Sequence, residues 1–239
     1  MNGWDLNAER RRRQITSGID LSYAHVLTPA ILKSLPKPDG RVWSRLLDAG
    51  CGTGALAERL WGVGWRVTGI DKSPAMVEIA RRDSGERDGL VFLEADFSQL
   101  PTLFGAGAFD VVVTNMSLTG VTDLRPSLRA LRKVVRRRGR LVLTDVHPWF
   151  WRQYKGHTEL TYWDTVGLAE PLAISLDPAP LPAPVQVVYR PLHELCEAVT
   201  EAGFLIQRVA EPRPPADIEA QYPQPWRYPR FILVVAGTR

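Results

Sequence analysis

The sequence lacks the long apolar segments that cross membranes. Among its 239 residues there is no run of about 18 apolar residues, so we expect no membrane span. It contains only two cysteines, Cys51 and Cys196, which predicts free thiols and excludes a disulfide framework. The residues after Met1 show no apolar core of a secretory signal. These absences together predict a cytoplasmic location.

Residues for metal binding and for covalent catalysis are also missing from the sequence. The histidines and cysteines do not occur at the spacing of a zinc site, and no Ser, His and Asp arrangement stands out. The formal net charge is only +4, and its basic runs have local explanations. Residues 10–13 are interpreted as a solvated helix face, and residues 136–138 as the end of a helix. Nucleic acid is therefore not an expected partner, and no metal is expected.

What the sequence does contain is an alternation of strand and helix signals. Apolar residues make up 45% and charged residues 23%, as in a globular domain. Alternation of this kind predicts βαβ units and a parallel sheet. The expected strands are 45–49, 65–70, 90–94, 109–114, 140–146, 204–211 and 231–236. The expected helices between them are 55–61, 74–82, 124–137 and 191–202. We expect one α/β domain over residues 1–239.

Two stretches depart from this alternation. Residues 149–189 are aromatic and then proline-rich, and they are too long for an ordinary connection. We expect them to form a lid-like insertion on the substrate side, following the fifth strand. Residues 1–40 precede the first strand, and we expect them to form a helical cover.

A glycine-rich turn follows the first strand in the sequence Leu-Leu-Asp-Ala-Gly-Cys-Gly-Thr-Gly of residues 46–54. Glycine at positions 50, 52 and 54 allows a ligand to lie against the backbone. The amides at the start of the next helix would face that ligand. The pattern predicts a nucleotide-type pocket. It also satisfies the loose dinucleotide signature, so an NAD-dependent dehydrogenase stays an alternative at this point.

Acidic residues follow three successive strands and narrow the choice of ligand. Asp48 precedes the glycine turn, where it could face a cationic or amine group. Asp71 ends the second strand, the position from which a carboxylate accepts ribose hydroxyls. Asp96 follows the third strand, where it could bind an adenine amino group while Phe97 packs on the ring. Three acids over one cleft would repel a pyrophosphate, so a neutral or cationic nucleoside is favoured.

With these motifs the chain resembles the class I S-adenosylmethionine-dependent methyltransferases, from about residue 22 to the C-terminus. The resemblance is carried by residues 48–54, 69–76, 95–97 and 109–115. It implies a Rossmann-like three-layer α/β sandwich with a seven-stranded, mostly parallel sheet whose last strand is antiparallel. S-adenosyl-L-methionine is the implied cofactor.

The resemblance also assigns roles to residues of this chain. Glycines 50 and 52 would line the methionine part of the cofactor, and Asp71 would hold the ribose. Met76 and Phe97 would flank the adenine. The full set of expected cofactor-binding residues is Tyr23, Asp48, Gly50, Cys51, Gly52, Asp71, Lys72, Met76, Asp96, Phe97, Asn115 and Met116. Tyr23 would lie near the cofactor carboxylate, and Asn115 and Met116 would present backbone beside the sulfonium.

His147 follows the fifth strand, at the sheet edge where ligands bind in open α/β folds. A histidine titrates near neutral pH, so we predict His147 as a catalytic general base. Pro148 makes a rigid corner next to it, and a purely structural role is the alternative. His147 and Pro148 belong to a stretch that is similar to a group of small-molecule methyltransferases, although Trp149 departs from that group's commoner pattern.

The sequence therefore predicts an enzyme that transfers the methyl group of S-adenosylmethionine to an O or N atom of a small-molecule acceptor. A monomer or homodimer is expected. The alternatives are an RNA or DNA methyltransferase and a non-catalytic S-adenosylmethionine-binding protein. Asn115-Met-Ser-Leu lacks the Asn-Pro-Pro-aromatic signature of adenine N6 enzymes, which argues against the first alternative.

Overall fold

The computed structural model describes residues 3–38, 44–174, 176–177 and 179–239. Residues 1–2, 39–43, 175 and 178 lie outside this description, so parts of the predicted cover and of the predicted insertion lie outside it too.

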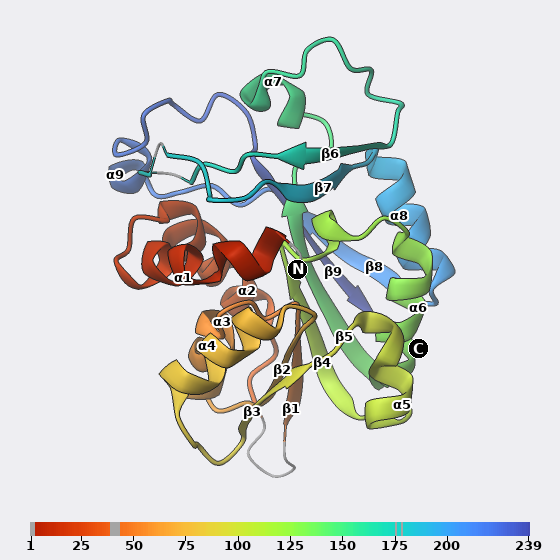
Figure 1. The fold of residues 1–239 in the computed structure, drawn as a ribbon. Coiled ribbons are helices and arrows are strands. Elements are labelled where there is room, and N and C mark those ends of the chain that lie inside the picture. Colours follow the sequence, from red (N-terminus) through yellow and green to blue (C-terminus); the bar gives the residue numbers. More distant parts are fainter. Residues whose placement is uncertain (1–2, 39–43, 175, 178) are drawn as a thin grey trace.

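A seven-stranded sheet forms the centre of the molecule (Figure 1). Its strands are β1 (Arg45–Ala49), β2 (Arg66–Asp71), β3 (Leu90–Glu94), β4 (Phe109–Asn115), β5 (Val135–Val146), β8 (Leu205–Ala210) and β9 (Phe231–Gly237). The order across the sheet is β3-β2-β1-β4-β5-β9-β8. Strand β9 pairs antiparallel with both β5 and β8, whereas β1 to β5 pair in parallel. The predicted fold class is confirmed.

Helices cover both faces of the sheet because alternate strand residues point to opposite sides. Leu46 packs with residues of α2 (Thr28–Ser34), α3 (Ala55–Gly62) and α4 (Pro74–Ser84). Its neighbour Leu47 belongs to the core shared with α5 (Leu100–Phe104), α6 (Leu124–Val134) and α8 (Leu192–Glu201). Both leucines are fully buried. The continuous apolar runs of the strands are explained by this burial on two sides.

Helix α6 ends earlier than the sequence pattern predicts. We expected a helix over 124–137, but α6 stops at Val134, and β5 begins at Val135. Val135 pairs with Phe109 of β4, and Arg136 forms an ion pair with Asp110 (2.7 Å). The arginines of residues 136–138 therefore lie in a strand and do not cap a helix. Pairing with a neighbouring strand has overridden helix propensity here.

The segment after β5 lies above the carboxyl ends of the parallel strands (Figure 1). It contains α7 (Trp151–Lys155), β6 (Val166–Glu170) and β7 (Val185–Tyr189), and β6 and β7 pair with each other in a separate antiparallel sheet. The remaining short elements are η1 (Ser22–Leu27), η2 (Phe97–Gln99), η3 (Leu118–Gly120) and α9 (Ala216–Glu219). No helix among the described residues has the length and apolar character needed to cross a membrane.

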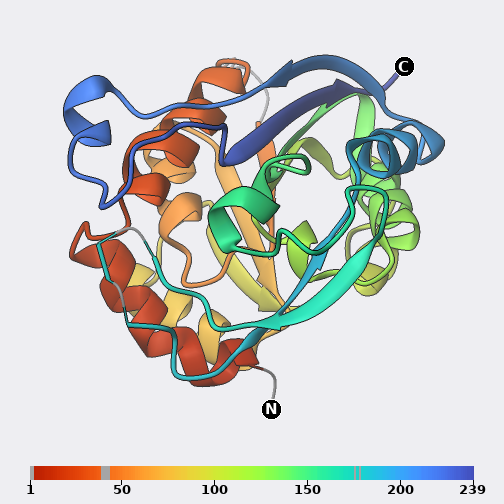
Figure 2. The same ribbon diagram turned by 90° about the horizontal axis from the view of Figure 1, so that it is seen from above.

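Helix α1 (Gly3–Thr16) runs beside the chain that leads into β7 (Figure 2). The buried Asn7 side chain donates to the carbonyl of Ala183 (2.8 Å) and accepts from its amide (2.9 Å). Arg10 and Gln14 both bind the Asp177 carboxylate, at 2.8 and 2.9 Å. The opposite side of α1 packs on α4. One helix thus contacts both α4, which covers the central sheet, and the segment above that sheet.

Candidate active site

The glycine turn joins β1 to α3 and is held against the end of β2. The amides of Gly50 and Cys51 both donate to the carbonyl of Ile70 at 2.8 Å. The backbone has a φ of +82° at Gly50 and +53° at Gly52, the left-handed region that favours glycine. A Cβ at Gly50 would lie 2.2 Å from Cβ of Ser117, whereas one at Gly52 would meet nothing within 4 Å. Gly50 therefore serves packing, and Gly52 faces open space.

Asp48 lies directly before this turn and has no partner for its charge. Its side chain is buried, and neither carboxylate oxygen has a hydrogen-bond partner among the described residues. Burial, and next the charge of Asp71, raise the pKa of Asp48 to about 7. The buried hydroxyl of Tyr23 also has no such partner, and burial and the nearby Asp48 raise its pKa. A bound cationic group would satisfy the carboxylate.

Asp71 ends β2 and organises the backbone around it. Its Oδ2 accepts from the amide of Gly52 and its Oδ1 from the amide of Ser73, both at 2.9 Å. Burial raises the pKa of Asp71, while these two hydrogen bonds and the exposed Lys72 act in the opposite direction. Each oxygen has a lone pair left to accept from a ligand hydroxyl. Ser73 also donates to Asp5 of α1 (2.6 Å), which brings that helix to the site.

The side predicted for an adenine holds one buried residue and one exposed acid. Met76 is buried and packs with Ala8 of α1. Asp96 is exposed, and its Oδ1 accepts from the amide of Ser98 (2.9 Å) in a capping box with Gln99. Phe97 is half-buried. Asp96 thus has a structural role at the start of η2, and its contact with an adenine stays a prediction.

Asn115 ends β4 and Met116 follows it, beside the glycine turn. The Asn115 side chain accepts from the hydroxyl of Thr144 (2.8 Å), and the Met116 amide donates to the carbonyl of Thr144 (3.0 Å). Met116 has a φ of +57°, which is rare for a residue other than glycine. The next residue, Ser117, donates to the carbonyl of Ala49 (2.7 Å). Strained backbone of this kind is common where a ligand binds.

Cys51 lies under the turn and is not a candidate nucleophile. Its thiol is buried, and burial together with Asp48 and Asp71 raises its pKa well above the ordinary value. A thiol in this environment stays protonated at neutral pH. The carboxylates of Asp48 and Asp71, both predicted from the sequence, act on the same thiol, so the structure brings the two acids together around this turn.

His147 lies between β5 and β9, with both ring nitrogens engaged. Nε2 contacts the Glu211 carboxylate at 2.9 Å, and Nδ1 accepts from the amide of Trp149 at 3.2 Å. Burial lowers the pKa of His147, and Glu211 opposes that shift. An imidazole paired with a carboxylate can act as an oriented base. To take a proton at Nδ1, however, His147 would have to release the Trp149 amide, so the catalytic role stays a prediction.

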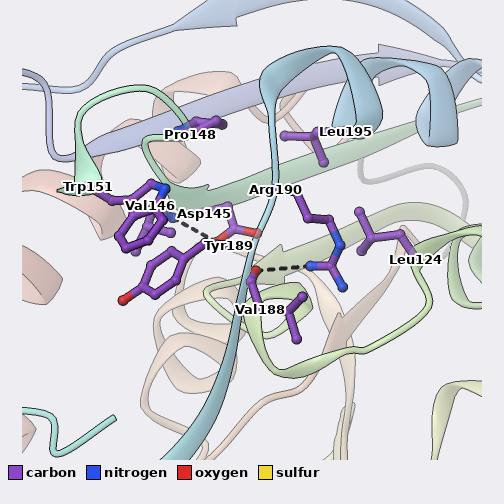
Figure 3. A pocket seen from close by; sticks show the side chains of 9 residues that line it. All are labelled: Leu124, Asp145, Val146, Pro148, Trp151, Val188, Tyr189, Arg190 and Leu195. Atoms are coloured by element: carbon purple, nitrogen blue, oxygen red, sulfur yellow. Dashed lines mark hydrogen bonds between the residues drawn. The ribbon is translucent and has the colours of Figure 1, made fainter. Parts of the chain in front are cut away.

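The sequence did not single out a further acid at this sheet edge, Asp145. Its side chain is buried near the end of β5 and lines a small cavity with Trp151, Tyr189 and Arg190 (Figure 3). Burial raises the pKa of Asp145 to about 7, against the hydrogen bond from the Val146 amide and the charge of Arg190. The signal was present, because Asp145 is one more acid near a strand's carboxyl end.

The aromatic residues that follow β5 divide into two groups. Trp151 and Tyr189 are buried and stacked, with ring centroids 3.5 Å apart. Trp149 and Trp163 are exposed, and Trp149 packs on Tyr162 with ring centroids 4.5 Å apart. The first group anchors the segment above the sheet, and the second is available to a partner or acceptor. Within the described ranges, no group of three or more His, Cys, Asp or Glu side chains could hold a metal ion.

The sequence and the fold of this chain are similar to those of known proteins. Residues 47–143, which run from β1 into β5, match the family model described as "Methyltransferase domain". The resemblance stated from the glycine turn and the strand-end acids is confirmed. The matched residues include the whole of the Asp48–Asp71 arrangement.

Two curated proteins are similar to part of this chain. A demethylmenaquinone methyltransferase of Thermus thermophilus is 36% identical over 139 residues, which cover 57% of this chain and 59% of the relative. A ubiquinone biosynthesis O-methyltransferase of Methylocella silvestris is 41% identical over 93 residues, covering 38% of this chain and 36% of the relative. The chain thus spans about half the length, or less, of these curated relatives.

Solved structures show that the methyltransferase fold extends over most of the chain. An S-adenosylmethionine-dependent methyltransferase of Mesorhizobium loti has a TM-score of 0.65 at 23% identity, covering 87% of this chain and 96% of that one. A geranyl diphosphate C-methyltransferase of Streptomyces coelicolor, solved with Mg²⁺, geranyl diphosphate and S-adenosyl-L-homocysteine, has a TM-score of 0.62 at 17% identity and covers 89% and 78%. At these identities the likeness concerns the fold alone.

Proposed function

We propose that this chain transfers the methyl group of S-adenosylmethionine to an oxygen or nitrogen atom of a small-molecule acceptor. One observation carries the proposal. The Asp48 carboxylate is buried without a partner next to a glycine turn that faces open space at Gly52. A cation beside such a carboxylate would hold it in the ionised form and satisfy its oxygens. The ammonium and sulfonium groups of the cofactor supply that charge.

In this proposal each predicted residue has a task at the cofactor. Asp48 and the Tyr23 hydroxyl bind the polar groups of the methionine part, with Gly50, Cys51 and Gly52 as backbone beneath them. Asp71, whose two oxygens each already accept one hydrogen bond from a backbone amide, binds the ribose hydroxyls. The remaining predicted residues, Lys72, Met76, Asp96, Phe97, Asn115 and Met116, surround the adenine and the sulfonium.

The bound cofactor would supply an activated methyl group on a positively charged sulfur. This chain would supply position, because the acceptor atom must approach the methyl carbon on the side away from sulfur. Strained Met116 and its neighbour Asn115 fix the end of β4 where that approach takes place. The segment of residues 149–189 would cover the acceptor, and residues 1–40 would cover the cofactor, both as parts of a single domain over residues 1–239.

The proposal also covers the acceptor, the location and the oligomeric state of the protein. The acceptor is a small molecule, as the names of the two relatives suggest for those proteins. A cytoplasmic location and a monomer or homodimer are expected. RNA or DNA methylation is the competing activity, and affinity for RNA that falls steeply with salt would favour it.

Titration calorimetry tests the cofactor assignment directly. We expect S-adenosylmethionine and S-adenosyl-L-homocysteine to bind and to raise the thermal midpoint, because only the folded state holds the pocket. NAD is the matched control and is expected to produce neither heat nor protection. The absence of both binding heat and thermal stabilisation with either sulfur compound would refute the proposal. Cofactor binding without methylation of any small molecule would favour a non-catalytic binding protein.

The predicted role of His147 is tested by two substitutions. We expect His147→Ala to lower turnover by about 100-fold or more, the usual effect of losing a general base, with cofactor affinity unchanged. His147→Gln can still donate toward Glu211 but cannot take a proton. Its turnover will match the alanine variant if His147 is the base, and will recover if His147 only positions the chain. Unchanged turnover in the alanine variant would remove His147 from the chemistry.

A further inference from the structure

A small cavity near the end of β5 has the dimensions of a single polar group. Its lining includes Asp145, Trp151 and Arg190 together with apolar Leu124 and Leu195 (Figure 3). The cavity volume is about 20 Å³, which is room for one water molecule or one hydroxyl group. Thr144, the residue before Asp145, pairs with Asn115 of β4. Asp145 is therefore one residue away from the strand pairing at whose end the proposed function places the sulfonium.

One wall of this cavity presents hydrogen-bond donors. The Trp151 side chain is fully buried, and its indole N–H has no hydrogen-bond partner among the described residues. An indole N–H can only donate, and a buried donor without an acceptor is unfavourable. Arg190 adds a positive charge on the other side of Asp145 (Figure 3). A ligand atom in the cavity therefore has to accept a hydrogen bond.

The other wall presents an acceptor. The Oδ1 atom of Asp145 accepts from the Val146 amide at 2.7 Å. The Arg190 guanidinium donates to three backbone carbonyls, those of Val121, Thr122 and Val188. Burial raises the pKa of Asp145 to about 7 against the charge of Arg190, so the carboxylate is ionised at pH 8. An ionised carboxylate only accepts hydrogen bonds. A ligand atom beside it therefore has to donate.

We propose that Asp145 and Trp151 form a subsite that binds a hydroxyl group of the methyl acceptor and discriminates against an aromatic amine at the same position. The proposal rests on the proposed function, because it assigns this cavity to that acceptor. A hydroxyl oxygen donates one hydrogen bond to Asp145 and accepts one from Trp151. The nitrogen of an aromatic amine can donate, but its lone pair is shared with the ring and accepts poorly. The Trp151 N–H would then stay unsatisfied.

Phenol and aniline, titrated at pH 8 against protein loaded with S-adenosyl-L-homocysteine, test this subsite with Asp145 ionised. We expect phenol to bind about tenfold more tightly than aniline, the effect of about one buried hydrogen bond. Asp145→Asn should abolish the preference, because its amide can keep the bond from Val146 only by turning its NH₂ group toward the ligand. Trp151→Phe should abolish it by removing the indole N–H. Leu124→Met, which alters an apolar lining residue of the same cavity, should keep it.

The results separate this subsite from the cofactor site. Asp145→Asn and Trp151→Phe should bind S-adenosyl-L-homocysteine like the unaltered protein, which also shows that they are folded. If Trp151→Phe does not fold, the isosteric Asp145→Asn variant decides. Equal affinities for phenol and aniline, no binding of either at the solubility limit, or a preference that survives Asp145→Asn would overturn the subsite. Repeating the titrations without S-adenosyl-L-homocysteine tests the subsite even if the cofactor assignment fails.

Discussion

Replacing Gly52 with alanine is expected to weaken cofactor binding by about 10- to 100-fold, because forcing a methyl group into filled space costs about 1–3 kcal/mol. A Cβ at this position meets no protein atom within 4 Å. The new methyl group would therefore collide with the cofactor and with nothing else. Because φ is +53° at Gly52, alanine also adds backbone strain, about 1–2 kcal/mol. Calorimetry with S-adenosyl-L-homocysteine measures the affinity, and thermal unfolding measures the strain.

Gly156→Ala is the matched control for this strain. Gly156 ends α7 with a φ of +82°, and a Cβ there also meets nothing within 4 Å. The two variants should lose similar thermal stability, while only Gly52→Ala loses cofactor affinity. Equal affinities in both variants would mean that the space at Gly52 is not occupied by the cofactor.

Asp48→Asn is expected to weaken binding of both sulfur compounds by about 10- to 100-fold, since a hydrogen bond to a charged group contributes about 1.5–3 kcal/mol. The pH dependence follows from the pKa of about 7. Below that value Asp48 is neutral and cannot pair with the cofactor's ammonium. The affinity of the unaltered protein should therefore fall as pH decreases from about 8 to 6, while that of Asp48→Asn should change little over the same range.

The same substitution should stabilise the protein without cofactor at pH 8. The folded state keeps the Asp48 proton up to pH of about 7, whereas an unfolded aspartate releases it near 3.8. Unfolding then releases a proton between these values, so the free energy of unfolding decreases as pH rises through them. Asparagine carries no such charge, so we expect a higher thermal midpoint at pH 8 for the variant.

Asp110→Asn is the control for both measurements on Asp48. Asp110 lies at the far end of β4, where it accepts from the Arg45 amide (2.7 Å) and pairs with Arg136. Its replacement should lower stability and leave cofactor affinity unchanged. If Asp48→Asn binds the cofactor like the unaltered protein, the buried carboxylate is not its partner.

The fold and the meeting of Asp48 with Asp71 could be predicted because their signals are local. The strand at residues 45–49 and the left-handed glycines after it depend on a few neighbouring residues. Acids that follow successive parallel strands must meet at one edge, and Asp48 and Asp71 do so. The contact of Asp71 with the Gly52 amide could not be predicted, since it depends on how two strands align.

The acceptor side depends on contacts between distant parts of the chain, which a sequence pattern does not encode. His147 is bound by Glu211, 64 residues later. Arg190 donates to the carbonyl of its near neighbour Val188 and to those of Val121 and Thr122, which lie 69 and 68 residues away in the sequence. The pairing of β6 with β7 likewise joins two stretches separated by a proline-rich segment. Asp145 had a sequence signal near the end of a strand, but its place in a cavity with Trp151 and Arg190 depends on such distant contacts.

Helix α1 has a consequence for the speed of the reaction cycle. Through Asp5 it contacts Ser73, next to Asp71, which we propose to bind the ribose, and it also binds Ala183 and Asp177 in the segment above the sheet. The product S-adenosyl-L-homocysteine could then dissociate only after this helix has broken these hydrogen bonds. Escape of that by-product, and not bond making, would set the pace of successive turnovers.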